Sequence, residues 1–303
     1  MEACGGSVLV LRSGASIGGA YELVVPLQSG AMGAVWEARH RAEGRPVAIK
    51  FLHASLVGTR AEQRMHYEAE ALSRFEHPAA ARVFEVGRTA DGVTFLVMEL
   101  LRGRTLLDLL DERWRIEATE AVCLLLPIAG ALASAHAAGV LHRDVKPSNV
   151  MLDEVTGSPK LIDFGLALLA SAARITQDGV LVGTPAYVAP ELARSGAAVD
   201  HRCDIWSFCV VLYHLVTGRI PFDGPGPIGI LEAIRTATPT PTTALRAGDD
   251  ALWAILQRGL QRAVEDRWPS MRELGRALAR WALAHGATRD ASGADLKRDW
   301  VER

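Results

Sequence analysis

The sequence predicts an α+β protein in which a β-rich part is followed by a mainly helical part. Residues 21–98 contain short alternating or β-branched runs separated by glycine turns, which indicates strands joined by hairpins. Beyond them, longer apolar patterns recur with helical spacing up to residue 285. The 303 residues, 49% of them hydrophobic, are enough for one large two-lobed domain or two ordinary domains. We expect an extension of low order over 1–20, a small lobe over 21–98, a hinge and large lobe over 99–285, and a polar tail over 286–303.

The β-rich part begins with a glycine-tipped hairpin. Residues 21–25 alternate between polar and β-prone side chains, and the chain turns around Gly30 and Gly33 before it returns through Val35. Glycine at such a tip lets backbone N–H groups approach a phosphate because no Cβ stands in the way, although most glycine hairpins are only turns. Further elements of this part are predicted as strands at 46–51, 82–88 and 93–98 and a helix at about 60–75.

The helical part contains one segment, residues 122–141, that is nearly free of charge and about long enough to cross a membrane. It contains Pro127, Gly130 and Gly139, and it leads directly into a polar loop that would then stand at the membrane boundary. We therefore expect a buried core helix and no membrane span. The other predicted elements are helices at about 105–111, 204–213, 228–235, 249–261 and 271–285 and short strands at 150–152 and 160–162.

Composition argues against several classes of protein. A formal net charge of −2 gives no electrostatic reason to expect a nucleic-acid partner. The four cysteines have neither metal-site nor disulfide-scaffold spacing, which indicates reduced thiols. The first residues lack the basic region and apolar core of a secretory signal. We therefore expect a cytoplasmic protein.

The loop over residues 141–149 concentrates groups that suit phosphoryl transfer. The carboxylate of Asp144 can accept a hydroxyl proton, and the ammonium of Lys146 can lie against a transferring phosphoryl group. The amide oxygen of Asn149 and, after the next predicted strand, the carboxylate of Asp163 are hard ligands of the kind that Mg²⁺ prefers. The sequence therefore indicates phosphoryl transfer that involves nucleotide phosphates and Mg²⁺.

Five motifs in the right order carry a resemblance to a known family. The loop reads His-Arg-Asp-Val-x-x-x-Asn, and it is followed by Asp163-Phe164-Gly165 and Ala189-Pro190-Glu191. Upstream stands Val47-Ala48-Ile49-Lys50, preceded by a glycine-rich segment in which Gln28 replaces the first glycine. The chain resembles the eukaryotic-like, Hanks-type serine/threonine protein kinases of bacteria. The resemblance implies a bilobal kinase-like fold that transfers the γ-phosphoryl group of Mg-ATP to protein Ser/Thr hydroxyls, with self-association for autophosphorylation.

The resemblance also implies the site residues. Asp144 is the expected base and Lys146 its neighbouring cation, while Lys50 pairs with Glu68, or with Glu70 as the second choice. Solvated helix charges are the ordinary alternative for these glutamates. Asn149 and Asp163 would hold Mg²⁺. The residues expected around ATP are Leu27, Gly30, Gly33, Val35, Ala48, Lys50, Glu99, Leu101 and Met151, with Met98 as the gatekeeper; core packing would explain the same apolar side chains.

Regulatory and structural residues follow from the same resemblance. Phosphorylated Thr176 would pair with Arg143, and Thr184 lies in the same segment before the Ala-Pro-Glu motif. Asp204 is expected to tether the catalytic loop, and Glu191 to pair with Arg267. Two alternatives remain open: a pseudokinase that binds without turnover, to which Gln28 points, and a kinase of small molecules.

Overall fold

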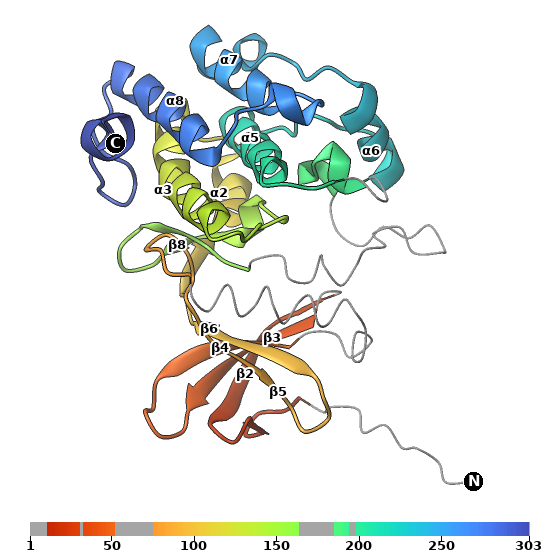
Figure 1. The fold of residues 1–303 in the computed structure, drawn as a ribbon, viewed down its shortest axis with the longest axis vertical. Coiled ribbons are helices and arrows are strands. Elements are labelled where there is room, and N and C mark those ends of the chain that lie inside the picture. The colour runs from red at the N-terminus through yellow and green to blue at the C-terminus, as the bar shows by residue number, and fades with distance from the viewer. Residues whose placement is uncertain (1–10, 31–32, 52–74, 164–184, 194–197, 303) are drawn as a thin grey trace. The chain divides into compact units, whose positions relative to one another are not determined.

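The computed structural model describes residues 11–30, 33–51, 75–163, 185–193 and 198–302 (Figure 1). They fall into two compact units. Of the described residues, the first unit comprises 11–30, 33–51, 75–76 and 81–101, and the second comprises 77–80, 102–163, 185–193 and 198–302. The predicted helix at 60–75, with Glu68 and Glu70, lies almost entirely outside the described residues.

The first unit is built on a six-stranded antiparallel sheet with the strand order β1-β2-β3-β4-β6-β5. One face of this sheet carries the core, because every second residue of a strand points to the same side. Val47, Ile49 and Phe51 on β4 therefore lie with Trp36 and Phe95 in one buried cluster. The strands are β1 (Ser16–Ile17), β2 (Tyr21–Gly30), β3 (Gly33–His40), β4 (Pro46–Phe51), β5 (Val83–Arg88) and β6 (Thr94–Glu99).

The predicted glycine-tipped hairpin is present as β2 and β3. Gly30 pairs with Gly33, whose φ of 126° favours glycine. The register shifts between Pro26 and Gln28, so Leu27 is the extra residue of a bulge.

The expected extension over 1–20 is shorter than its sequence suggested. Ser16 and Ile17 form β1 against the start of β2, and Ile17 is only 3% exposed. The sequence did not indicate this strand, because two residues between glycine-rich segments leave no periodic pattern. Ile17 belongs to the buried core cluster and Leu11 packs against that cluster, so the described residues from 11 onward are part of the first unit.

Among the described residues, the second unit combines a three-stranded sheet with six α-helices. The sheet order is β7-β8-β9, formed by Gly103–Thr105, Val150–Asp153 and Pro159–Leu161. The α-helices are α2 (Leu106–Arg113), α3 (Ala118–Ala137), α5 (Arg202–Thr217), α6 (Gly226–Thr236), α7 (Asp250–Gly259) and α8 (Met271–Ala284), with short 3-10 turns η2 (Pro147–Asn149), η3 (Pro185–Tyr187), η4 (Pro190–Ala193), η5 (Thr242–Leu245) and η6 (Val264–Asp266).

Helix α3 is the long apolar element that the sequence predicted, but it begins and ends about four residues earlier. Glu117 caps its start by accepting from the N–H of Glu120, and Gly139 follows its end with a φ of 76°. Within the described part of the chain, α3 is the helix that is long and apolar enough for a membrane span. However, 67% of its apolar window is buried in the protein, where α5 and α8 pack against it (Figure 1).

The segment expected to be a polar tail is folded instead. Leu296 and Trp300 are 0% and 4% exposed, and a π-helical turn, η7 (Lys297–Val301), packs against α8. Pro127 explains part of this docking, because proline has no N–H to donate to the carbonyl of Cys123 one helical turn earlier. The N–H of Ala291 donates to that carbonyl at 3.0 Å. The returning chain thus satisfies a backbone group that α3 leaves without a helical donor.

Helices α5 and α7 approach closely at Cys209 and Gly259. A Cβ on Gly259 would overlap the sulfur of Cys209. The side chain of Cys209 on α5 is therefore accommodated because residue 259 on α7 has no side chain.

Candidate active site

Asp204, in the first turn of α5, binds the backbone of the catalytic loop, residues 141–149, through its side chain. Its two carboxylate oxygens accept from the N–H groups of His142 at 2.9 Å and Arg143 at 2.7 Å, and His136 lies 2.8 Å from one of them. Burial alone would raise the pKa of Asp204, but the hydrogen bond and charge of His136 and the bonds from the loop bring it below its ordinary value. The carboxylate therefore stays ionised and fixes the loop, as expected for this residue.

The ring of His142 supports the same loop from inside the protein. The N–H of Asp144 donates to Nδ1 at 3.2 Å, so the ring proton is placed on Nε2, 3.3 Å from the carbonyl oxygen of Ile162. Complete burial lowers the pKa of His142 and favours this neutral form. Arg143, between the two, has a φ of 61°, a conformation that is uncommon for a residue with a side chain.

The three groups predicted to act together in the loop do meet. Lys146 Nζ lies 2.7 Å from Asp144 Oδ2, and Asn149 Nδ2 donates to the same oxygen at 3.0 Å and to the Asp144 carbonyl at 2.8 Å. The side chain of Asp144 is 13% exposed and that of Lys146 is 26% exposed. The carboxylate is thus oriented by two donors while it remains accessible.

Asn149 and Asp163 come together through the pairing of β8 with β9. The N–H of Ile162 donates to the Asn149 carbonyl at 2.8 Å, which places Asp163 beside Asn149 at the end of the hairpin. Because Nδ2 of Asn149 donates to Asp144, Oδ1 is the atom of this amide that a metal ion could take as a ligand. One amide and one carboxylate oxygen suit a magnesium ion that takes further ligands from a nucleotide. No group of three or more His, Cys, Asp or Glu side chains forms a self-sufficient metal site in the described parts of the chain.

The expected pair of Glu191 and Arg267 is also present. Two parallel hydrogen bonds of 2.7 and 2.8 Å join the carboxylate to the guanidinium, and Arg267 is 1% exposed. The Ala-Pro-Glu segment is thereby attached to the chain around residue 267.

In the first unit, Lys50 is buried at 5% exposure on the face of β4 that lies opposite the core cluster. Its cross-strand partners are Val35 on β3 and Leu96 on β6, and Ala48 pairs with Met98 on the same face. The sheet therefore groups several residues that were predicted to surround ATP.

The remaining residues that were predicted to bind ATP or to regulate the protein differ in exposure, in contacts and in the unit to which they belong. Leu27 is 48% exposed in its bulge, and Glu99 uses its N–H and its carboxylate to bind the backbone of Arg82. Leu101 is half-buried at the end of the first unit, whereas the half-buried Met151 lies on β8 of the second unit. Thr176 and Thr184 lie outside the described residues.

Two contacts around η3 were missed by the sequence analysis. The carbonyl of Tyr187 accepts from Ser207 Oγ at 2.7 Å, and its hydroxyl lies 2.8 Å from His214 Nδ1. Ser207 and His214 are seven residues apart on α5 and therefore share one helix face. The seven-residue spacing was visible in the sequence, but its partner was not.

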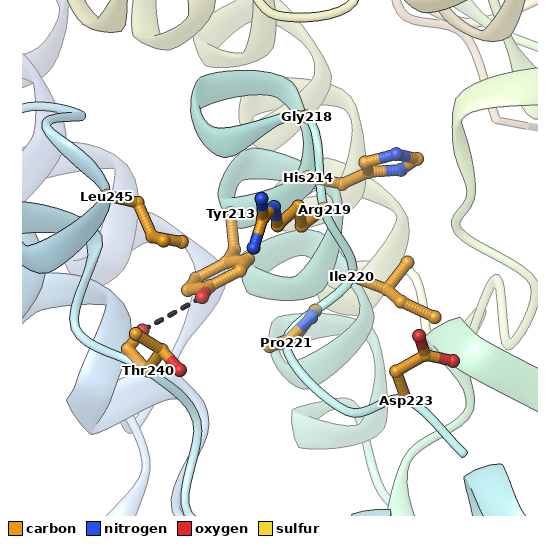
Figure 2. Close-up of a pocket in the computed structure, with 9 residues that line it drawn as sticks. All are labelled: Tyr213, His214, Gly218, Arg219, Ile220, Pro221, Asp223, Thr240 and Leu245. Carbon is orange, nitrogen blue, oxygen red and sulfur yellow. Dashed lines mark hydrogen bonds between the residues drawn. The ribbon is translucent and has the colours of Figure 1, made fainter.

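His214 also lines a pocket of about 630 Å³ at the C-terminal end of α5, to which none of the predicted catalytic residues contributes. Figure 2 shows Arg219 beside the ring of Tyr213, whose hydroxyl donates to the carbonyl of Thr240 at 2.8 Å, and Asp223 on another side. This pocket is therefore separate from the catalytic loop.

Comparison with known proteins agrees with this geometry. Residues 21–270 match the family described as protein kinase domain. The serine/threonine-protein kinase pkn3 of Myxococcus xanthus is 34% identical over 84% of this chain and 48% of its own length. Pkn2 of the same organism is 38% identical over 89% of this chain and 33% of its own length. The chain thus spans half or less of these relatives.

Solved structures show the same fold. The crystal structure of the Mycobacterium tuberculosis PknI kinase domain matches with a TM-score of 0.72 and 28% identity, covering 89% of this chain and 99% of that one.

A third relative by sequence is the serine/threonine-protein kinase PknL of Mycobacterium bovis, which is 41% identical over 69% of this chain and 52% of its own length. By motif order, fold and sequence, the chain belongs to the protein kinase domain family, among the bacterial Hanks-type serine/threonine kinases.

Proposed function

We propose that this chain transfers the γ-phosphoryl group of Mg-ATP to Ser or Thr hydroxyls of proteins, including copies of itself. The observation that carries the proposal is the cluster in which Lys146 and Asn149 both contact one carboxylate oxygen of Asp144. The structural carboxylate of Asp204 is 0% exposed, whereas the carboxylate of Asp144 is oriented by two donors and is 13% exposed.

Asp144 would orient the acceptor hydroxyl and take its proton as the oxygen attacks phosphorus. The hydrogen bonds from Lys146 and Asn149 reach one oxygen of this carboxylate, Oδ2, and orient the group. The hydrogen bonds that the loop backbone donates to Asp204 would keep the carboxylate of Asp144 in place, because small displacements of a reacting group are costly in rate.

Lys146 would move its ammonium from Asp144 toward the transferring phosphoryl group, which carries negative charge on its equatorial oxygens. Asn149 and Asp163 would hold the metal, and Mg²⁺, when bound, neutralises charge on the nucleotide phosphates. Lys50, with a glutamate from the segment 60–75 as its partner, would orient the phosphates.

Phosphate transfer from labelled ATP to a generic protein substrate and to the chain itself tests the proposal. Asp144→Asn keeps the size of the side chain but removes the base, so transfer should fall by about 10²- to 10⁴-fold. Asp153→Asn, the same change at a half-buried aspartate of β8 whose carboxylate accepts from the N–H of Thr156, should leave transfer unchanged. Equal transfer by wild type and Asp144→Asn would contradict the role of Asp144.

Measurement of ATP binding and of the phosphate acceptor, with the same proteins, separates the proposal from its two alternatives. Wild type that binds ATP but transfers no phosphate under any metal condition would be a pseudokinase. Transfer to a small alcohol but to no protein would instead indicate a small-molecule kinase. Mapping of the modified residues by mass spectrometry tests whether Thr176 or Thr184 is a site of self-phosphorylation, and Thr176→Ala tests whether Thr176 controls activity.

A further inference from the structure

Gln28 stands where the protein kinase pattern has its first glycine, and the structure shows that this position makes no use of glycine's backbone freedom. Gln28 lies in β2 and pairs with Val35, and its φ is not positive. A side chain is therefore tolerated here without strain. The difference from the family pattern adds a carboxamide to the hairpin rather than distorting it.

The sheet determines the direction of this side chain. Trp36 and Ala38 on β3 belong to the core cluster, so Val35 between the turn and Trp36 points to the opposite face. Gln28 is the cross-strand partner of Val35, and directly paired residues share a face. Val35 in turn pairs with Lys50 on β4. Gln28, Val35 and Lys50 thus form one row across three strands on the face opposite the core.

The spacing of this row suits a nucleotide. Neighbouring strands lie about 4.8 Å apart, which separates the backbone of Gln28 from that of Lys50 by about 10 Å. The side chain of Gln28 is exposed, whereas that of Lys50 is 5% exposed. A ligand that reaches Lys50 with its phosphates while it lies under Val35 passes within the reach of the Gln28 carboxamide.

We propose that the carboxamide of Gln28 donates a hydrogen bond to an oxygen of the ribose-triphosphate part of the bound nucleotide. This inference rests on the proposed function, since it needs ATP on the face that carries Lys50. Gln28 is then a substrate-binding residue that this chain has and the family pattern lacks. It also removes the sequence argument for a pseudokinase, because Gln28 replaces glycine with a contact.

Equilibrium binding of ATP, ADP and adenosine to wild type, Gln28→Ala and Gln28→Gly tests the inference, together with KM and kcat for ATP. Loss of one hydrogen bond should weaken ATP binding and raise its KM by about three- to tenfold, with kcat unchanged within about twofold. Both variants should behave alike, because both lack the carboxamide. Glu22→Gln, an exposed residue on the same strand, is the matched control and should bind ATP as wild type does.

The ligand series identifies the accepting oxygen. If a phosphate accepts, adenosine binds all proteins equally and only ATP and ADP lose affinity. If a ribose hydroxyl accepts, adenosine loses affinity too, and 2′,3′-dideoxy-ATP binds wild type and Gln28→Ala equally. Unchanged affinities for ATP, ADP and adenosine in Gln28→Ala, or tighter ATP binding by Gln28→Gly, would overturn the inference. Wild type that binds ATP without transferring phosphate would instead contradict the proposed function and leave the binding test intact.

Discussion

Glu191 and Arg267 lie 76 residues apart in the chain and form two parallel hydrogen bonds of 2.7 and 2.8 Å. The guanidinium also donates to the carbonyl oxygens of Gln261 at 2.7 Å and Arg202 at 3.0 Å. This network joins η4, α5 and the turn before α8.

Arg267→Ala should lower the free energy of unfolding by about 3–5 kcal/mol, because it leaves the buried Glu191 carboxylate without its cation. Arg267→Lys should recover only part of this loss, since an ammonium cannot form the two parallel bonds. Denaturant titration measures both effects.

Arg113 and Glu120 provide the control for this prediction. They also form two hydrogen bonds, of 2.6 and 2.8 Å, but each side chain is 41% exposed. Arg113→Ala should cost less than about 1 kcal/mol. Similar losses for Arg113→Ala and Arg267→Ala would show that burial does not decide the strength of the pair at 267.

The contact between Cys209 and Gly259 predicts a coupled pair of mutations. Gly259→Ala should destabilise the chain by about 1–3 kcal/mol, because its Cβ would overlap the Cys209 sulfur. In a Cys209→Ala background the same change should cost much less, since the sulfur is gone. A double-mutant cycle in denaturant gives the coupling energy, and additive effects would contradict the overlap.

The buried Trp300 leads us to expect that residues 286–302 contribute to the stability of the fold. Its ring lies against Gly275, and Arg272 stacks over it at 5.1 Å. Trp300→Ala should reduce stability by about 3–5 kcal/mol. Trp114→Ala, at a tryptophan that is 61% exposed, should have a much smaller effect. Equal thermal stability of wild type and Trp300→Ala would mean that residues 286–302 do not contribute to the fold.

Three histidines, of which His142 is fully buried and His77 and His214 are half-buried, predict how the free energy of unfolding depends on pH. Burial lowers the pKa of His77, His142 and His214 below the ordinary 6.5. The unfolded chain therefore binds more protons than the native chain just below pH 6.5, so the free energy of unfolding should fall as the pH drops from 7.5 to 5.5.

His214→Asn should make this pH dependence shallower, because it removes one of the three histidines. Above pH 7.5 all three are neutral in both states, so the dependence on their protonation should vanish there in both proteins. Denaturation curves at each pH measure the effect. A slope that is equally steep in wild type and His214→Asn would contradict the role of His214.

Local sequence patterns were sufficient to predict many of the strands and helices of this protein and the residues of its loop over 141–149. Alternation and glycine turns predicted β2 to β6, because a strand with one buried face repeats every two residues. The loop over 141–149 and the proposed metal ligands Asn149 and Asp163 could be picked out because their chemistry is concentrated in short segments of the chain. For α3, composition predicted a core helix, while its capping residues set the ends about four residues away from the expected ones.

The tertiary structure alone decided contacts between distant segments. The docking of residues 286–302 depends on the carbonyl that Pro127 leaves for Ala291, and the position of Tyr187 depends on Ser207 and His214. The direction of Gln28 depends on its pairing with Val35. A sequence records which groups can form such bonds, but the partners of a hydrogen bond between remote residues are chosen only when packing brings their backbones together.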